Sequence, residues 1–271
     1  EVADHAMMLL LATFRDVIQQ DKMVREGRWR EGRPALLKIP RLSGLTLGLI
    51  AFGHVARAVA RPAAPFGLRV IAYDPYIEEI VMAEHGVLPA TLQEVLTQSD
   101  FISMHVPLVD ATRKMINADM LAHARHGAVL LNFSREGVVD EAAVLAALEA
   151  KKLAAYVCDF PSPHVNGHPH VIALPHLGAS TGEAEENCAI MVADQLREYM
   201  EHGNVQNAVN FPNITMPRES SFRIAIANAN VPNMVGQIST CLGDAGVNIS
   251  DLLNKSCLLY TSPSPRDRTR S

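Results

Sequence analysis

The segment LTLGLIAFGHVARAVARPAAPFGLRVIAYD, residues 45–74, decides the fold of this chain. Its first apolar run, Leu47–Phe52, has no polar face, which is typical of a strand covered by helices on both faces of a parallel sheet. Gly53 then opens a helix, and a second apolar run ends in Asp74. The segment therefore predicts a strand, a glycine turn, a helix and a second strand.

The turn and the acid together predict a dinucleotide site. A carboxylate roughly twenty residues after such a turn binds the adenosine ribose hydroxyls, and its charge disfavours the extra phosphate of NADP. We therefore expect NAD as the cofactor, bound by Asp74 and by the turn residues Gly53, His54 and Val55.

The glycine pattern of this turn is imperfect. The three positions of the GxGxxG pattern are occupied by Ala51, Gly53 and Ala56, and the methyl group of Ala51 stands where the first glycine usually permits close passage. Pro62 also interrupts the following helix near Arg61, because proline has no N–H to donate. We expect NAD to bind more weakly than it binds to a standard glycine turn.

The rest of the first half continues the alternation of strands and helices. Four further apolar runs predict strands: Phe101–Val106, Ala128–Phe133, Leu153–Cys158 and Val171–Leu174. This alternation is typical of an α/β fold with a doubly wound parallel sheet of the Rossmann type. A helix over Val2–Gln19, apolar nearly all round in its middle, precedes the first strand and is expected to be buried.

The second half has a different organisation. We assign residues 1–175 to an NAD-binding domain with its leading helix, and residues 176–212 to a long helix and a linker. Residues 213–256 begin a small second domain. Its predicted elements are a strand at Phe222–Ala227, a helix at Met234–Leu242 and a strand at Val247–Leu252.

The last residues, 257–271, break this pattern. Cys257–Asp267 reads CLLYTSPSPRD, which resembles the translation of a sequencing adapter rather than a natural continuation. We expect this tail to be an artefact and infer no function from it.

The composition excludes several classes of function. The formal net charge is -5, with 48% hydrophobic and 20% charged residues, as in an acidic globular protein without the basic stripe of a nucleic-acid binder. The four cysteines form no CxxC pair, which argues against a zinc site or a disulfide framework and favours a cytoplasmic location. No apolar run is long enough to span a membrane. We expect no metal, no nucleic acid and no membrane as partners.

Three segments together resemble the D-2-hydroxyacid dehydrogenases: residues 47–74, LLNFSREGVVDEAAV at 130–144 and LPHLGAST at 174–181. Within that family, AAYVCDFPSP at residues 154–163 and the residues after Pro175 are similar to the ACT-domain-bearing D-3-phosphoglycerate dehydrogenases. The resemblance implies a Rossmann-type NAD domain, a remnant of a substrate domain in the long helix, and a partial α+β ACT domain. It also implies a homo-oligomer.

The resemblance assigns roles to single residues. Arg135 matches the family's catalytic arginine, which holds the substrate carboxylate, and His176 matches the general acid/base. Further cofactor contacts are implied at Pro107, Thr112, Phe133, Ser134 and Gly178. The reaction implied is hydride transfer between C2 of 3-phosphoglycerate and the nicotinamide.

One expected catalytic residue is missing. Pro163 stands where the family has a glutamate that orients the histidine. We hypothesise that the neighbouring Asp159 contacts the nicotinamide end of NAD, and we consider an orienting role toward His176 the weaker alternative.

Other expectations concern the two ends of the chain. Most of the family's substrate domain precedes the position of Glu1, so we expect this chain alone to oxidise no phosphoglycerate. Asn230 and Asn248 match positions that bind serine in some members, but Asn228 and Asn233 depart from that pattern, so an amino-acid effector and a purely structural role are both open. The alternative functions are a glyoxylate or hydroxypyruvate reductase and an NAD-sensing protein like the corepressors of this family.

Overall fold

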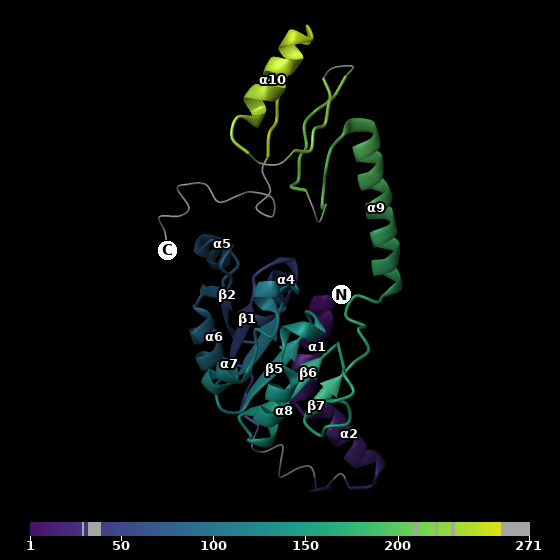
Figure 1. Cartoon of the computed structure of the whole chain (residues 1–271). Coiled ribbons are helices and arrows are strands. Elements are labelled where there is room, and N and C mark those ends of the chain that lie inside the picture. Colours follow the sequence, from purple (N-terminus) through teal and green to yellow (C-terminus); the bar gives the residue numbers. More distant parts are fainter. Residues whose placement is uncertain (29, 32–38, 209–210, 220–221, 229–230, 256–271) are drawn as a thin grey trace. The chain divides into compact units, whose positions relative to one another are not determined.

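The computed structural model of the chain describes residues 1–271 except 29, 32–38, 209–210, 220–221, 229–230 and 256–271 (Figure 1). The expected artefactual tail and Asn230 therefore lie outside the described residues. The chain divides into two compact units, Glu1–Thr181 and Gly182–Ser271, which we describe separately.

The described residues of the first unit form one sheet of seven strands in the order β3-β2-β1-β4-β5-β6-β7, and every neighbouring pair is parallel. The strands are β1 (Thr46–Ile50), β2 (Arg69–Tyr73), β3 (Leu88–Pro89), β4 (Phe101–Met104), β5 (Ala128–Asn132), β6 (Leu153–Cys158) and β7 (Val171–Ala173). The predicted doubly wound parallel sheet is confirmed. The strand β3 was not predicted, since two residues carry no periodicity.

Helices cover both faces of the sheet and make two apolar cores (Figure 1). Helices α1 (Val2–Phe14) and α4 (His54–Ala63) contribute to one core, and α6 (Leu92–Gln98), α7 (Ala118–His123) and α8 (Glu141–Glu149) contribute to the other. The remaining helix on the sheet is the short α5 (Glu79–Glu84). Leu49 faces the first core and Ile50 the second, so β1 is buried on both sides as its composition predicts.

A glycine in β1 sets how closely a helix approaches the sheet. A Cβ atom at Gly48 would meet the side chains of Ser99 and Val95 well inside van der Waals contact. Any larger residue at this position would push α6 and the loop that follows it away from the sheet.

The strand order places a switch point between β1 and β4. From β1 the chain winds outward to β2 and β3, and it then returns to the other side of β1 to build β4–β7. In such sheets ligands bind in the crevice at the carboxyl ends of the strands, at the point where the winding reverses.

The single helix predicted over Val2–Gln19 is wrong in one respect. The structure ends α1 at Phe14 and begins a second helix, α2 (Val17–Arg25), because Asp16 takes a positive φ of 53°. Two local features support the break. The Thr13 hydroxyl donates to the Leu9 carbonyl at 2.6 Å, and aspartate tolerates the left-handed conformation better than most residues.

The interruption predicted at Pro62 takes the form of a helix end. Helix α4 stops at Ala63, one residue after Pro62, so the helix behind the glycine turn is short. Because Pro62 has no N–H, the Ala58 carbonyl four residues earlier lacks its intrahelical donor, which weakens the last turn of α4.

The described residues of the second unit form two helices, α9 (Gly182–His202) and α10 (Met234–Asp244). Helix α10 confirms the predicted helix at Met234–Leu242. The predicted strands Phe222–Ala227 and Val247–Leu252 are wrong, since neither segment forms a strand. Strands are stabilised by hydrogen bonds to neighbouring strands, and the β-pairing among the described residues of this unit is one bridge, between Val205 and Ile214.

The observed division of the chain differs from the predicted boundary at residue 175. The segment from His176 to Thr181 belongs to the first unit, in which the Gly178 N–H donates to Asp159. Helix α9 groups with the following residues. Among the described residues, no helix combines the length and apolar character that a membrane crossing requires.

Candidate active site

The turn between β1 and α4 has the backbone conformation that the GxGxxG pattern predicts, although alanine occupies its first glycine position. Ala51 takes a φ of 74°, a conformation that favours glycine, and its N–H donates to the Tyr73 carbonyl at 2.8 Å. Gly53 directly precedes α4, and a Cβ atom there would meet nothing within 4 Å. The turn is therefore open on the side of Gly53, where a cofactor phosphate could approach the backbone.

Asp74 fastens the end of β2 to this turn. Its Oδ2 accepts the Phe52 N–H at 2.8 Å, and its Oδ1 accepts the Tyr76 N–H at 2.8 Å. Each carboxylate oxygen has a second acceptor position, so both can still accept a hydrogen bond from a ribose hydroxyl. The structure thus gives Asp74 a second task, bracing the turn, that its position in the sequence did not reveal.

Pro107 and Thr112 lie in the loop that follows β4. The Thr112 hydroxyl donates to the Pro107 carbonyl at 2.6 Å and accepts the Val109 N–H at 2.9 Å. His105, at the start of this loop, donates its N–H to the Ile50 carbonyl at 2.9 Å and so joins the ends of β4 and β1. Burial lowers the pKa of His105 from 6.5 to about 4, which keeps its ring neutral at pH 7.

The loop after β5 is shaped by Asn132, which the sequence analysis missed. This residue is fully buried; its Oδ1 accepts the Ser134 N–H at 3.0 Å, and its Nδ2 donates to the Arg135 carbonyl at 3.0 Å. The available signal was an amide side chain at the end of an otherwise apolar strand. The Ser134 hydroxyl is buried and has no hydrogen-bond partner among the described residues, which leaves a donor for a cofactor group.

Arg135 and His176 meet through one aromatic ring. The Arg135 guanidinium carbon lies 5.9 Å from the centre of the Phe160 ring, and the His176 ring centre lies 4.6 Å from the same ring. Arg135 also donates to the Ser134 carbonyl at 2.7 Å. His176 is exposed and has a φ of 54°. The two predicted catalytic residues, 41 positions apart in the sequence, therefore share a neighbour, Phe160, that was not among the predicted site residues.

Asp159 is buried, and its carboxylate is bound by residues other than Arg135 and His176. Its Oδ1 lies 2.8 Å from His5 Nε2, and its Oδ2 accepts the Gly178 N–H at 3.1 Å. His176 is not among its partners, so the orienting role considered for Asp159 has no support in the contacts of the described residues. His5 was missed by the sequence analysis, although a lone histidine in an apolar helix was a usable signal.

In the part of the chain that the structure describes, no carboxylate contacts His176 in place of the glutamate expected at Pro163. The adjacent Ser162 instead donates its hydroxyl to Glu141 Oε2, and the second oxygen of Glu141 is buried without a partner. The Ser162–Glu141 pair joins the loop after β6 to the start of α8. Among the described residues, neither member of this pair contacts His176.

All twelve predicted site residues therefore lie in the first unit, after the carboxyl ends of the strands. They follow β1 (Gly53, His54, Val55), β2 (Asp74), β4 (Pro107, Thr112), β5 (Phe133, Ser134, Arg135), β6 (Asp159) and β7 (His176, Gly178). The open turn, the brace at Asp74 and the unpaired Ser134 hydroxyl fit a dinucleotide bound along this edge. Among the described residues, no cluster of His, Cys, Asp or Glu could hold a metal ion.

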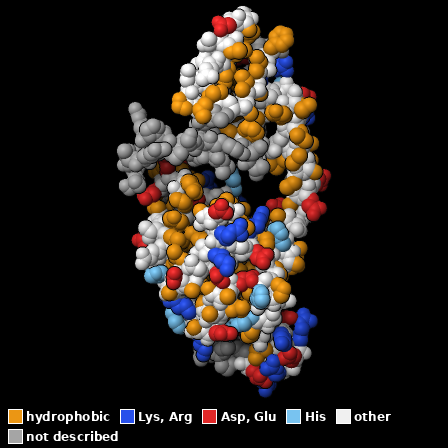
Figure 2. Space-filling model, in the orientation of Figure 1, with side chains coloured by type: hydrophobic (Ala, Val, Ile, Leu, Met, Phe, Trp, Pro, Cys, Tyr) orange, Lys and Arg blue, Asp and Glu red, His pale blue; other side chains and the backbone are white. Residues whose placement is uncertain are grey.

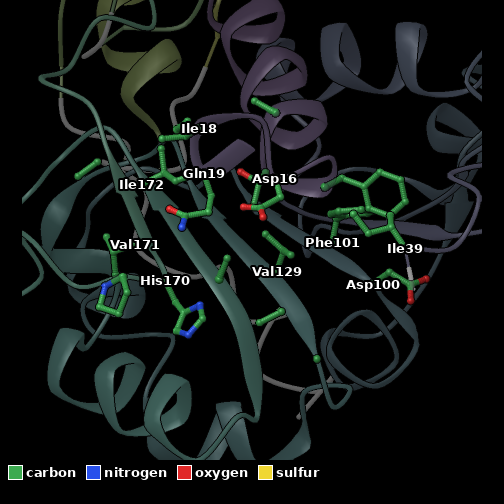
Figure 3. Close-up of a pocket in the computed structure, with 18 of the residues that line it drawn as sticks. Asp16, Ile18, Gln19, Ile39, Asp100, Phe101, Val129, His170, Val171 and Ile172 are labelled. Atoms are coloured by element: carbon green, nitrogen blue, oxygen red, sulfur yellow. The ribbon is translucent and has the colours of Figure 1, made fainter. Parts of the chain in front are cut away.

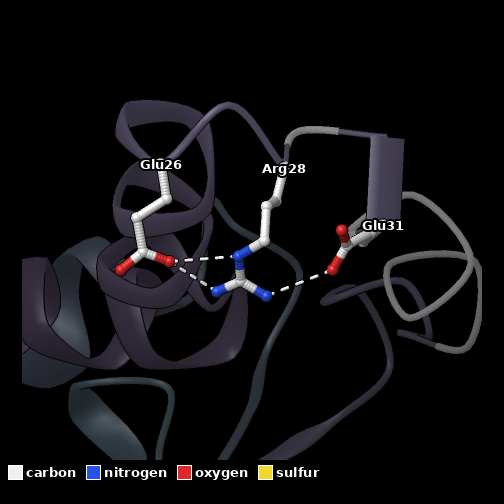
Figure 4. A network of polar contacts seen from close by, with 3 residues as sticks. All are labelled: Glu26, Arg28 and Glu31. Atoms are coloured by element: carbon white, nitrogen blue, oxygen red, sulfur yellow. Dashed lines mark hydrogen bonds and ion pairs between the residues drawn. The ribbon is translucent and has the colours of Figure 1, made fainter.

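Two other features of this unit lie away from the predicted site. A cavity of about 680 Å³ is lined by residues of α1 and α2, by β7 and by residues at the amino ends of β4–β6 (Figure 3). Its lining includes Phe101, the first residue of β4, and Asp100 just before it, whereas the predicted site follows the other ends of the strands. On the surface, Arg28 joins Glu26 and Glu31 in an exposed network (Figure 4).

Comparison with known proteins gives this arrangement a family. A family model for the D-isomer specific 2-hydroxyacid dehydrogenases, NAD binding domain, matches residues 7–178. The chain is 33% identical over 259 residues to the D-3-phosphoglycerate dehydrogenase of Methanocaldococcus jannaschii, covering 93% of this chain and 48% of that protein. It is 34% identical over 219 residues to the D-3-phosphoglycerate dehydrogenase of Bacillus subtilis, covering 79% of this chain and 41% of that protein.

A solved structure with the same fold is a glyoxylate reductase from Paecilomyes thermophila, with a TM-score of 0.69 and 28% identity over 77% of this chain and 64% of that chain. The chain spans less than half the length of the two curated relatives. The chain belongs to the D-isomer specific 2-hydroxyacid dehydrogenase family and contains the NAD-binding domain of that family.

Proposed function

We propose that this chain is the cofactor-binding part of an NAD-dependent D-3-phosphoglycerate dehydrogenase. The observation that carries the proposal is the contact of both Arg135 and His176 with Phe160, beside Ser134 and Asp159 at the carboxyl ends of β5 and β6. The oxidation of a hydroxy acid needs a cation to bind the carboxylate and a base to accept the hydroxyl proton, and Arg135 and His176 can supply these two groups side by side.

The two side chains have separate tasks in this reaction. Arg135 keeps its charge at every working pH, so it can bind the substrate carboxylate and stabilise negative charge on the C2 oxygen. His176 accepts the proton of the C2 hydroxyl. NAD, when bound, accepts the hydride from C2. The side chain of Asn132 bonds to the backbone of Ser134 and Arg135, and these two hydrogen bonds hold the loop that carries the guanidinium.

The substrate class is supported by the extent of the similarity. The M. jannaschii and B. subtilis relatives named D-3-phosphoglycerate dehydrogenase are 33% and 34% identical to this chain, whereas the glyoxylate reductase is 28% identical. We favour 3-phosphoglycerate over glyoxylate for this reason. A reductase acting on glyoxylate or hydroxypyruvate is the second candidate, because the first unit alone has the same fold.

The same proposal includes a place in serine biosynthesis, a cytoplasmic location and a homo-oligomeric assembly. Reduced thiols at Cys158, Cys188 and Cys241 are compatible with a reducing compartment. An amino-acid effector bound by residues 213–256 is part of the ACT interpretation. Asn233 supports that interpretation in one detail, since its φ of 67° suits the glycine that ACT modules usually have there.

The test uses the complete gene product with 3-phosphoglycerate and NAD, and separately with glyoxylate and NADH. We expect phosphoglycerate oxidation, and a loss of at least about a hundredfold in turnover for His176→Asn and Arg135→Lys. The control is Arg125→Lys, which changes an exposed arginine paired with Asp100 at the other end of the sheet. Reduction of glyoxylate without oxidation of phosphoglycerate would select the second candidate, and full activity of Arg135→Lys would refute the assignment of Arg135.

A matched experiment uses the 271-residue chain itself. It should bind NADH, since the described turn and Asp74 belong to it, and it should oxidise no 3-phosphoglycerate. Robust turnover by this chain would show that the substrate site is already complete.

A further inference from the structure

A buried pair of side chains joins the first helix to the predicted active site. His5, near the start of α1, places its Nε2 2.8 Å from Oδ1 of Asp159, which follows β6. The two side chains are 11% and 3% exposed. A carboxylate so deeply buried needs hydrogen-bond donors to offset its lost hydration, and among the described residues it has the His5 imidazole and the Gly178 N–H.

The pair holds the segment that carries His176. Gly178 is two residues after His176, and its N–H donates to the other oxygen of Asp159 at 3.1 Å. The contact leaves no room for a side chain, since a Cβ atom at Gly178 would lie 2.9 Å from that oxygen. The position of this backbone therefore depends directly on where the Asp159 carboxylate is fixed.

His5 also contacts the loop after β5. Its ring packs edge-on against Phe133, with ring centres 5.7 Å apart. Phe133 directly precedes Ser134 and Arg135. One imidazole in α1 thus contacts both sides of the site, the loop of Arg135 and, through Asp159, the loop of His176.

We propose that His5 is a positioning residue for the active site. By holding Asp159 in place, His5 fixes the Gly178 backbone and, through it, the approach of His176 to Phe160. Its catalytic consequence rests on the role proposed above for His176, but the mechanical link does not. Helix α1, which precedes β1 in the chain, therefore contributes a positioning residue to the active site.

The experiment compares two amide replacements of His5 in the 271-residue chain. In His5→Gln the side-chain amide nitrogen reaches the position of Nε2, whereas in His5→Asn it reaches only that of Nδ1. Two NMR signals report the link: the Gly178 amide proton, which donates to the carboxylate, and the imidazole protons of His176, which the Phe160 ring current displaces. NADH binding is measured by fluorescence on the same samples.

We expect His5→Asn to move both NMR signals toward their values in an unstructured chain and to weaken NADH binding about tenfold, the effect of losing one charged hydrogen bond. His5→Gln should restore the signals and bind NADH within threefold of the unaltered chain. Should His5→Asn be too unstable to study, Asp159→Asn tests the same link, because it removes the charge that Gly178 contacts.

The control is Ala6→Gly, which weakens the same helix at a buried position without touching Asp159. Unchanged Gly178 and His176 signals in His5→Asn would overturn the proposal, as would equal displacement of those signals in Ala6→Gly. If the unaltered chain binds no NADH, the proposed function fails, and the two NMR signals still decide the role of His5.

Discussion

The two units of this chain differ in what becomes of their apolar side chains. In the first unit the central strands and the helix faces packed on them bury theirs, as at Leu49 and Leu96. In the second unit neither α9 nor α10 has a buried residue, and large apolar side chains such as Leu196 and Met200 are exposed. Figure 2 shows hydrophobic side chains along α9.

The difference shows that a segment with an apolar pattern buries its side chains only where other strands or helices pack against it. Each central strand of the first unit has a neighbour on both edges and helices on both faces, so its side chains leave water. The second unit has the pattern of an amphipathic helix and of two strands, but its described residues form no sheet. Its exposed apolar surface is of the kind that associates with another surface.

A matched pair of leucines on helices gives the largest expected effect. Leu96 on α6 is 1% exposed and Leu196 on α9 is 59% exposed. Leu96→Ala should lower the free energy of unfolding by about 2–5 kcal/mol, because it leaves a cavity in a close-packed core. Leu196→Ala should change it by less than about 0.5 kcal/mol. Urea denaturation followed by circular dichroism measures both; similar losses would mean that α9 is packed in solution.

The next effect concerns pH. Burial lowers the pKa of His105 in the folded state to about 4. As pH falls from about 6.5 to 4, the unfolded chain binds a proton at this ring and the folded chain does not, so the folded state loses up to about 3 kcal/mol of stability. His105→Gln should remove this part of the pH dependence.

The matched control for pH lies in the second unit. His202 ends α9, outside the first unit, so His202→Gln controls for the loss of one imidazole from the chain. Denaturant midpoints at several pH values between 4 and 8 test the two variants. A steep loss of stability that persists in His105→Gln would assign the effect to other groups.

A smaller effect is expected at two residues with positive φ. Ala51 in the glycine turn has a φ of 74°, and Asn233 before α10 has a φ of 67°. Ala51→Gly should stabilise the fold by about 0.5–1 kcal/mol, because relief of the Cβ contact exceeds the entropic cost of glycine. It should also tighten NADH binding.

Asn233→Gly is the counterpart of that change. Asparagine already tolerates the left-handed conformation, so this variant should change stability by only about 0.3 kcal/mol or less. Thermal melting and NADH titration separate the two cases. No gain in either measurement for Ala51→Gly would show that the turn is not strained by alanine.

The smallest effect on stability is expected on the exposed face of α9. Met200 is 80% exposed, so Met200→Lys should change the free energy of unfolding by less than about 0.5 kcal/mol. It should nevertheless reduce self-association and the binding of an apolar dye, because it places a charge on the apolar surface. Light scattering at increasing protein concentration measures this, and Asn187→Lys, at an exposed polar position of the same helix, controls for one added charge.

Much of the fold was predictable because its signals are local. The apolar runs that became β1, β2 and β4–β7 end within about two residues of their predicted bounds, since a strand buried on both faces needs no partner to be recognised in a sequence. The location of four site features at the strand ends was also predictable, because each comes just after an apolar run: the glycine turn, Asp74, Arg135 and His176.

The contacts that build the site were decided only by the tertiary structure. His5 and Asp159 are 154 residues apart, and neither residue's neighbours in the chain indicate the other. The ring of Phe160 joins Arg135 to His176 for the same reason, through the parallel strands that bring their carboxyl ends to one edge. Periodicity along a chain predicts which segments are strands or helices, whereas side-chain pairs across a sheet depend on strand order and packing. The sequence by itself therefore determined the sheet and its cofactor, and the fold decided which side chains meet around it.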